Sequence, residues 1–299
     1  MTYINFVIAR SVPYLRGIMS KPTQKNNLHP AHKGIKELRH WRPDQKWYHP
    51  FLCSSVVRLS QYILGRKNIL TFHGRERWDA LFANNQWKDT QGRGLLSFSN
   101  HVSLFDDPLL ISNLGTTNIN DVRWIAADHK NFFGSNLKGI IYSGGRCVPI
   151  IRGGGLEQPG FDFLIERLKN GEWVHIFPEG GRSRDKEHRI QKNFKIGIGK
   201  LMRETNPVVM PFYHYGMHDV LPIGKAFPHS GKKVDVYFGE PTIITDRWWD
   251  DLLKDTPSAI TPHSSWKQAS VWAEKTLLNL EAKYRPQAEK IRETSSQAG

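Results

Sequence analysis

The stretch Gly94–Pro108, with the sequence GLLSFSNHVSLFDDP, decides the fold of this 299-residue chain. Residues 94–99 form a short apolar run, which is typical of a buried strand. Asp107 and Pro108 favour the start of a helix, because Asp is a preferred N-cap and Pro is preferred at the first helical position. A strand, a loop and a helix in this order indicate an α/β sheet, in which functional residues gather at the carboxyl ends of the strands.

His101 and Asp106 lie in the loop of that stretch and are the predicted catalytic residues. Residues five apart in a regular helix point about 140° away from each other, so these side chains meet only if the chain turns between them. A histidine that a carboxylate holds in one tautomer is suited to activating a hydroxyl group as a general base. A hydrogen bond that merely supports the turn is the alternative at this point.

A second run, residues 172–184, combines a predicted strand with a loop of glycine and arginine. Residues 172–177 are apolar-rich, and Pro-Glu-Gly-Gly-Arg-Ser-Arg follows directly. Gly180 lets a ligand approach the backbone, and the forked donors of Arg182 match phosphate oxygens. Glu179 is expected to stay ionised and to organise the arginines. The run predicts an anion-binding cradle, with a solvated charged loop as the alternative.

These two runs, with residues 146–153 and 216–222, resemble the glycerolipid acyltransferase superfamily. Its signatures are a His, four residues and an Asp, followed by Phe-Pro-Glu-Gly and an arginine. Within it the chain is similar to the tafazzin family of phospholipid transacylases over about residues 50–245. The resemblance implies that His101 removes the proton from the free hydroxyl of a lysophospholipid while Asp106 orients the ring. It also implies that Arg152 helps to hold the substrate phosphate at the cradle of Glu179 and Gly180, with Arg182 joining it if the acyl-CoA-type pattern applies.

The sequence is compatible with two acyl donors. Arg182, two residues after Gly180, makes the cradle look more like that of acyl-CoA-dependent lysophosphatidate acyltransferases than that of many tafazzins. A phospholipid and acyl-CoA are therefore both possible donors, and no other cofactor is expected.

No metal site is predicted. His214 and His218 have a spacing that suits two metal ligands on a helix, but no third ligand accompanies them, and Pro211 and Gly216 argue against a helix there. The two cysteines, Cys53 and Cys147, show neither a metal-binding nor a disulfide pattern.

The charge of the chain favours an anionic partner. Lys and Arg number 42 against 28 Asp and Glu, which gives a formal charge of +14. No zinc-finger spacing, RNA-recognition motif or basic heptad region indicates nucleic acid. The expected partners are phospholipid and lysophospholipid substrates and an anionic membrane surface; ordinary solvation is the alternative reading of the charge. A non-enzymatic membrane-binding scaffold is the alternative function, and the oligomeric state is left open.

The expected organisation has three parts. Residues 1–48 form a basic N-terminal arm, whose first 36 residues lack Asp and Glu and suit either a mitochondrial transit peptide or a segment on anionic headgroups. Residues 49–250 form the acyltransferase domain, and residues 251–299 form a C-terminal helix, expected over 265–284, and a loose polar tail.

Residues 51–64 are predicted to form an interfacial membrane helix, because fourteen mostly apolar residues are too few to span a bilayer. Its predicted membrane-facing residues are Phe51, Leu52, Val56, Val57, Leu59, Ile63 and Leu64. An ordinary buried helix is the alternative, and the resemblance favours an anchor. The resemblance also implies a membrane-associated protein, at a mitochondrial membrane if eukaryotic or at the cytoplasmic face of the inner membrane if bacterial.

The rest of the chain alternates predicted strands and helices. Further strands are expected at residues 122–127, 147–151, 208–213 and 233–239, and helices at 132–141 and 161–169. Such alternation predicts an α/β fold with a mainly parallel central sheet flanked by helices.

Overall fold

The computed structural model describes residues 38, 40–43, 47–82, 93–114, 122–256 and 261–297. Most of the predicted basic arm, residues 1–37, 39 and 44–46, lies outside the described residues.

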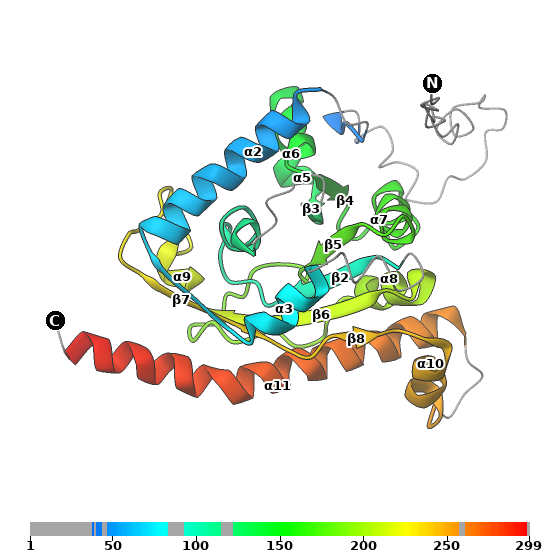
Figure 1. The fold of residues 1–299 in the computed structure, drawn as a ribbon. Helices are drawn as coiled ribbons and strands as arrows, with labels where there is room; N and C mark the ends of the chain where they lie inside the picture. The colour runs from blue at the N-terminus through cyan, green and yellow to red at the C-terminus, as the bar shows by residue number, and fades with distance from the viewer. Residues whose placement is uncertain are drawn as a thin grey trace, which may run out of the picture.

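A mainly parallel sheet forms the centre of the molecule, as the alternation of elements predicts (Figure 1). Its strands follow the order β1-β7-β6-β2-β5-β3-β4, and β8 pairs with β6. Among the strands of the described residues, only the pairs β6–β7 and β6–β8 are antiparallel. The strands are β1 (Ile69–His73), β2 (Leu95–Ser99), β3 (Trp124–Asp128), β4 (Cys147–Ile150), β5 (Trp173–Ile176), β6 (Val208–Tyr215), β7 (Lys233–Phe238) and β8 (Thr242–Ile243). The sequence patterns missed β1 and β8.

Helices cover both faces of the sheet (Figure 1). The helical elements are α2 (His49–Ser60), α3 (Arg75–Phe82), α5 (His129–Phe132), α6 (Asn136–Gly144), α7 (Pro159–Lys169), α8 (Gly197–Thr205), α9 (Met217–Val220), α10 (Asp246–Leu253) and α11 (Pro262–Gln297), with the π-helical turns Gln61–Arg66 and Asp106–Leu110 and the 3₁₀ turn Ile111–Asn113. Strand β2 is buried along its whole length. Leu96 and Phe98 enter the core beneath α7, α8 and α11, whereas Leu95 enters the core on the other face, because successive side chains of a strand point to opposite faces.

Two predicted helices differ from the structure. The helix expected at residues 132–141 is two helices, α5 and α6, because Phe133 turns into the core and Ser135 caps α6 by accepting the backbone N–H of Lys138. The tail expected to be loose after Arg285 continues α11 to Gln297 and passes through Pro286. Tertiary contacts explain the continuation.

The contacts that hold the end of α11 come from side chains that the sequence pattern did not mark. The Tyr284 ring stacks on Tyr237 with 4.6 Å between ring centroids. Arg285 donates to the backbone oxygen of Glu187 over 2.6 Å, and Arg292 donates to that of Tyr215 over 3.2 Å. These contacts offset the backbone hydrogen bond that proline removes from a helix.

The predicted interfacial segment is helical, first as α2 and then as the π-helical turn 61–66. Phe51 and Leu59 are exposed, and Leu52, Val56, Val57 and Ile63 are partly buried. Leu64 is a correction: it is fully buried in the core, because the π-helical turn directs it inward. Within the described residues, no helix combines the length and the apolar character needed to cross a bilayer.

Candidate active site

The loop after β2 folds His101 against Asp106, as the predicted turn requires. His101 Nδ1 lies 2.9 Å from Asp106 Oδ2. The same oxygen accepts the backbone N–H groups of Val102 and Ser103 over 2.7 and 2.9 Å. These hydrogen bonds hold the Asp106 carboxylate against the backbone of the loop, so that the carboxylate sets the position of the His101 ring.

The helix that follows begins at Asp106, two residues before the predicted first helical residue Pro108, and is a π-helical turn. Asp107 does not cap it, because its carboxylate pairs with Arg123. The Arg123 Nε donates to Asp107 Oδ1 over 2.6 Å, and its Nη2 donates to Oδ2. Arg123 also donates to the backbone oxygen of Gly145 over 2.9 Å. This ion pair joins the loop of His101 and Asp106 to the segment between α6 and β4.

The environment of Asp106 favours its ionised form. Burial raises its pKa, whereas His214 and the hydrogen bonds from His101 and Ser103 lower it, and the net pKa lies below the usual value. Burial also lowers the pKa of His214, so that ring is neutral near pH 7. We therefore assign the ionised state of Asp106 chiefly to its hydrogen bonds. An ionised Asp106 accepts the Nδ1 proton of His101, which leaves Nε2 as the proton acceptor.

Phe177, directly after β5, completes the surroundings of His101. The two rings are nearly parallel, with centroids 4.1 Å apart and an angle of 11° between their planes. The side chain of His101 is 17 % exposed and lines a cavity of about 1620 Å³. A parallel aromatic ring in contact restricts the orientation of the imidazole.

Glu179 lies behind His101 and not among the arginines, in contrast to the expectation from sequence. Its carboxylate accepts the backbone N–H of His101 over 2.6 Å and that of Gln191 over 2.7 Å. The expectation that Glu179 stays ionised is also wrong. Burial raises its pKa to about 8, against the effect of the two backbone hydrogen bonds. Glu179 therefore ties the histidine loop to the segment that follows β5.

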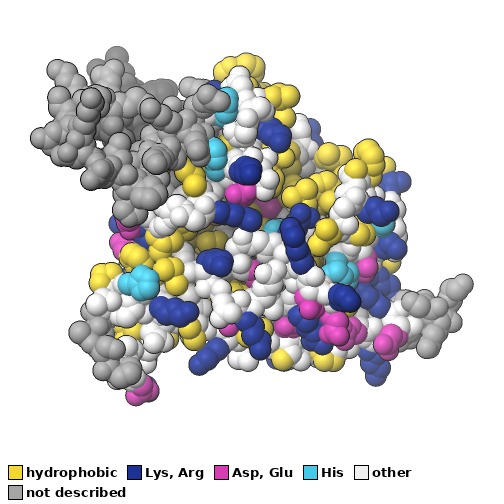
Figure 2. Space-filling view, turned by 180° about the vertical axis from the view of Figure 1, so that it is seen from behind, with side chains coloured by type: hydrophobic (Ala, Val, Ile, Leu, Met, Phe, Trp, Pro, Cys, Tyr) yellow, Lys and Arg dark blue, Asp and Glu magenta, His cyan; other side chains and the backbone are white. Residues whose placement is uncertain are grey.

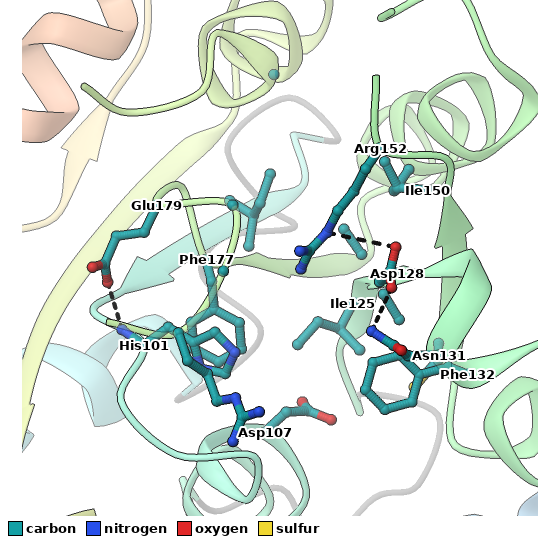
Figure 3. Close-up of a pocket in the computed structure, with 18 of the residues that line it drawn as sticks. His101, Asp107, Ile125, Asp128, Asn131, Phe132, Ile150, Arg152, Phe177 and Glu179 are labelled. Atoms are coloured by element: carbon teal, nitrogen blue, oxygen red, sulfur yellow. Dashed lines mark hydrogen bonds and ion pairs between the residues drawn. The ribbon is translucent and has the colours of Figure 1, made fainter. Parts of the chain in front are cut away.

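Basic and apolar side chains both line the cavity beside His101, and Figure 3 shows Arg152 with the apolar Ile125, Ile150 and Phe132 near it. The predicted residues Arg152, Gly180 and Arg182 line the cavity, as do Arg184 and Lys195. Its apolar lining includes residues from α2 to β4, among them Cys53, Val56, Val57, Ile125, Phe132, Ile141 and Tyr142. Such a cavity matches a molecule with an anionic headgroup and a hydrocarbon chain.

Arg152 extends into the cavity from the end of β4 (Figure 3). Its side chain is 62 % exposed, and its Nε lies 3.5 Å from Asp128 Oδ1. Asn131 donates to the other oxygen of Asp128. A Cβ placed on Gly181 would lie 3.7 Å from the Arg152 guanidinium, so the loops after β4 and β5 adjoin. The structure therefore brings Arg152 to the Gly180–Arg182 loop.

Two side-chain contacts at the site were not predicted from the sequence. Lys195 lies next to Gly180, where a Cβ would approach its side chain to 2.8 Å. Asn100 exchanges hydrogen bonds of 2.9 Å with the backbone N–H and oxygen of His214 and so holds the start of the histidine loop against β6. The sequence did carry a signal for Asn100, because it is a polar residue directly before His101. The sequence carried no such signal for Lys195, because its position beside Gly180 depends on the tertiary structure.

His214 and His218, which have a metal-ligand spacing in the sequence, lie on different elements. His214 lies fully buried in β6, and His218 lies on the short helix α9. Among the described side chains, no group of three or more His, Cys, Asp or Glu is placed to hold a metal ion.

The comparisons with known proteins agree with this geometry. Residues 70–215 match the sequence model of the acyltransferase family. Tafazzin of Drosophila melanogaster is 33 % identical over 223 residues, which cover 72 % of this chain and 57 % of that protein. Taffazin of Dictyostelium discoideum is 34 % identical over 158 residues, which cover 50 % of this chain and 54 % of that protein.

A plant relative has a different name. N-acylphosphatidylethanolamine synthase of Arabidopsis thaliana is 32 % identical over 161 residues, which cover 50 % of this chain and 56 % of that protein. The chain thus spans a little over half the length of these relatives. The family match, residues 70–215, includes both the loop of His101 and the loop of Glu179. The chain belongs to the acyltransferase family and is related to the tafazzins.

Proposed function

We propose that the protein is an acyltransferase that moves fatty acyl chains between phospholipids and lysophospholipids. The observation that carries the proposal is the His101–Asp106 pair, 2.9 Å apart, in the wall of a cavity that both basic and apolar side chains line. A lipid substrate needs both kinds of lining, because its phosphate and its acyl chain require opposite surroundings. The tafazzin relatives support a phospholipid as the donor.

The proposed reaction uses no covalent intermediate on the protein. His101 Nε2 removes the proton from the free hydroxyl of the lysophospholipid as the hydroxyl oxygen attacks the acyl carbonyl carbon of the donor. The bond between that carbon and the donor oxygen then breaks, and the departing oxygen takes the proton back from His101. Asp106 stabilises the imidazolium between these steps. The products are a reacylated phospholipid and a new lysophospholipid.

Acyl-CoA is the second candidate donor. Arg182, Arg184 and Lys195 all line the cavity, and three cations suit the several phosphates of coenzyme A as well as a lipid headgroup. No other cofactor enters the proposed reaction.

A role in cardiolipin remodelling is the finer form of this proposal, and it rests on the tafazzin resemblance. The same resemblance supports a mitochondrial membrane as the location in a eukaryote, and the cytoplasmic face of the inner membrane in a bacterium.

Membrane association is also part of the proposal. Trp47 and Phe51 at the start of α2 are 81 % and 68 % exposed. Leu137 of the adjoining helix α6 is 68 % exposed. Hydrophobic side chains gather along the upper edge of the molecule (Figure 2), the end at which α6 and the start of α2 lie in Figure 1. An apolar edge of this kind suits insertion at headgroup depth.

An assay with two donors tests the function. Purified protein is incubated with a lysophospholipid and either acyl-labelled phosphatidylcholine or labelled acyl-CoA, with the His101→Ala variant as the control. Transfer from phosphatidylcholine without CoA, lost in the variant, is expected. Transfer from acyl-CoA alone would show that the donor is acyl-CoA and not a phospholipid. Vesicle binding without transfer from either donor would contradict the enzyme and favour the scaffold.

A further inference from the structure

The loop of residues 221–232, between α9 and β7, exposes apolar side chains that the cavity does not use. Phe227 is 82 % exposed and Ile223 is 50 % exposed. Isolated apolar residues are common on protein surfaces, but a phenylalanine this exposed, in the same loop as a second exposed large apolar residue, leaves much apolar area in water. Neither residue belongs to the predicted membrane helix.

Hydrogen bonds fasten this loop to the chain directly after α2 and its π-helical turn. The backbone N–H of Gly231 donates to the oxygen of Lys67 over 2.7 Å. Lys232 donates its N–H to the side-chain oxygen of Asn68 over 2.9 Å, and its own oxygen accepts the N–H of Ile69 over 2.8 Å. The loop is therefore held beside the end of α2 (Figure 1).

The two adjoining segments have the same charge character. No Asp or Glu occurs in residues 45–75 or in residues 220–234. The exposed basic residues in them include Arg58, Arg66, Lys67 and Lys225. Exposed apolar residues, Leu59 and Tyr62, lie among these bases. Basic side chains mixed with exposed apolar ones complement an anionic bilayer, whose headgroups attract the charges while the boundary below accepts the apolar groups.

We propose that residues 221–232 form a second membrane contact, which acts with α2 to orient the protein on an anionic lipid surface. The inference deepens the proposed function by naming the surface from which the lipid substrate enters. A single helix lying in the interface leaves the protein free to rotate about the helix axis. A second contact at the side of the helix removes that freedom. The α2 wall of the cavity, formed by Val56 and Val57, then keeps a fixed orientation to the bilayer.

A fluorescent label on the loop tests the contact directly. The two native cysteines are buried, so an environment-sensitive NBD group attached to Phe227→Cys reports on the loop. Ile243→Cys on β8, where Ile243 is 48 % exposed, is the matched control. Vesicles of phosphatidylcholine with an anionic lipid are expected to raise the emission and shift it to shorter wavelength at position 227, and not at position 243.

Three outcomes would overturn the proposal. One is an unchanged emission at position 227 on vesicles that bind the protein. Another is an equal response to purely neutral vesicles. The third is a response to rising protein concentration without vesicles, which would assign the loop to contact with a second copy of this chain.

A charged variant supplies an independent measurement. Phe227→Glu is expected to weaken binding to anionic vesicles at least about fivefold, because an apolar side chain leaves the interface and a negative charge enters it. Ile243→Glu is expected to bind like the unmodified protein, and equal binding by both variants would contradict the proposal. Acyl transfer to substrates dispersed in detergent should be the same in both. If no acyl transfer is found but position 227 responds to vesicles, the proposed function fails and the membrane contact stands.

Discussion

Asp106 Oδ2 accepts the His101 Nδ1–H over 2.9 Å while it also accepts the backbone N–H groups of Val102 and Ser103. One oxygen thereby fixes both the fold of the loop and the tautomer of the base. The loop is short, and the carboxylate is fully buried. The ring can therefore accept a proton at Nε2 without first reorienting, which is the property that a general base needs.

Asp106→Asn is expected to lower turnover by about 10²- to 10⁴-fold with little change in KM for lipid. An amide does not stabilise the imidazolium, and its NH2 group opposes the donors that surround the carboxylate. Steady-state kinetics measure the effect, and Asp250→Asn on the exposed side of α10 is the control. A variant that raises KM and leaves turnover unchanged would show that Asp106 acts in binding only.

Arg152→Ala is expected to raise KM for a phospholipid about 10-fold or more, because a charge-assisted hydrogen bond to a phosphate is lost. Arg152→Lys should recover part of the loss, since it keeps the charge and loses the forked geometry. Initial rates against substrate concentration provide the measurement. The exposed Arg247 of α10, replaced by alanine, controls for net charge; an equal effect at both positions would refute a phosphate contact by Arg152.

Glu179→Gln is expected to remove a pH dependence of stability. The pKa of Glu179 rises from 4.5 in the unfolded chain to about 8 on folding. Below pH 4.5 the carboxyl is protonated in both states. Between these pH values only the unfolded chain releases the proton, so stability falls as pH rises, by at most about 1.4 kcal/mol per pH unit.

Urea unfolding of both proteins between pH 5 and pH 9 measures this contribution as the difference between their free energies of unfolding. As pH rises toward 8, the Gln variant should become more stable relative to the unmodified protein, and the difference should level off above pH 8. Parallel curves would mean that burial does not shift the pKa of Glu179.

Gly199→Ala is expected to destabilise the fold by about 1–3 kcal/mol. A Cβ at this position in α8 would lie 1.9 Å from the backbone oxygen of Trp266, so α8 and α11 would have to move apart. At Gly145 a Cβ would meet atoms no nearer than 3.6 Å, so Gly145→Ala should change stability much less. Chemical denaturation compares the two, and similar losses would contradict the close packing of α8 on α11.

The sequence predicted the parts of the fold that depend on local pattern. The apolar run before His101 predicted β2, and the alternation of elements predicted the mainly parallel sheet. The His101–Asp106 contact was also predictable, because the spacing required a turn. The path of α11 through Pro286 was not, because Arg285 and Arg292 hold it by contacts with residues far away in the sequence.

The same distinction holds within the site. The position of Arg152 beside the Gly180 loop follows from two strands that end at one edge of the sheet. The surroundings of Glu179 did not follow, because the backbone amides that bind it come from His101 and Gln191. The pairing of Asp107 with Arg123 could not be predicted from the sequence either, because Arg123 lies in a different loop.

The most direct measurement is acyl transfer by His101→Gln, with folding and vesicle binding checked in parallel. Glutamine retains hydrogen bonding at a similar length and lacks a titratable ring. The variant should bind vesicles like the unmodified protein and should transfer acyl chains from phosphatidylcholine to a lysophospholipid about 10² to 10⁴ times more slowly. Transfer within about threefold of the unmodified rate would contradict a general base at His101.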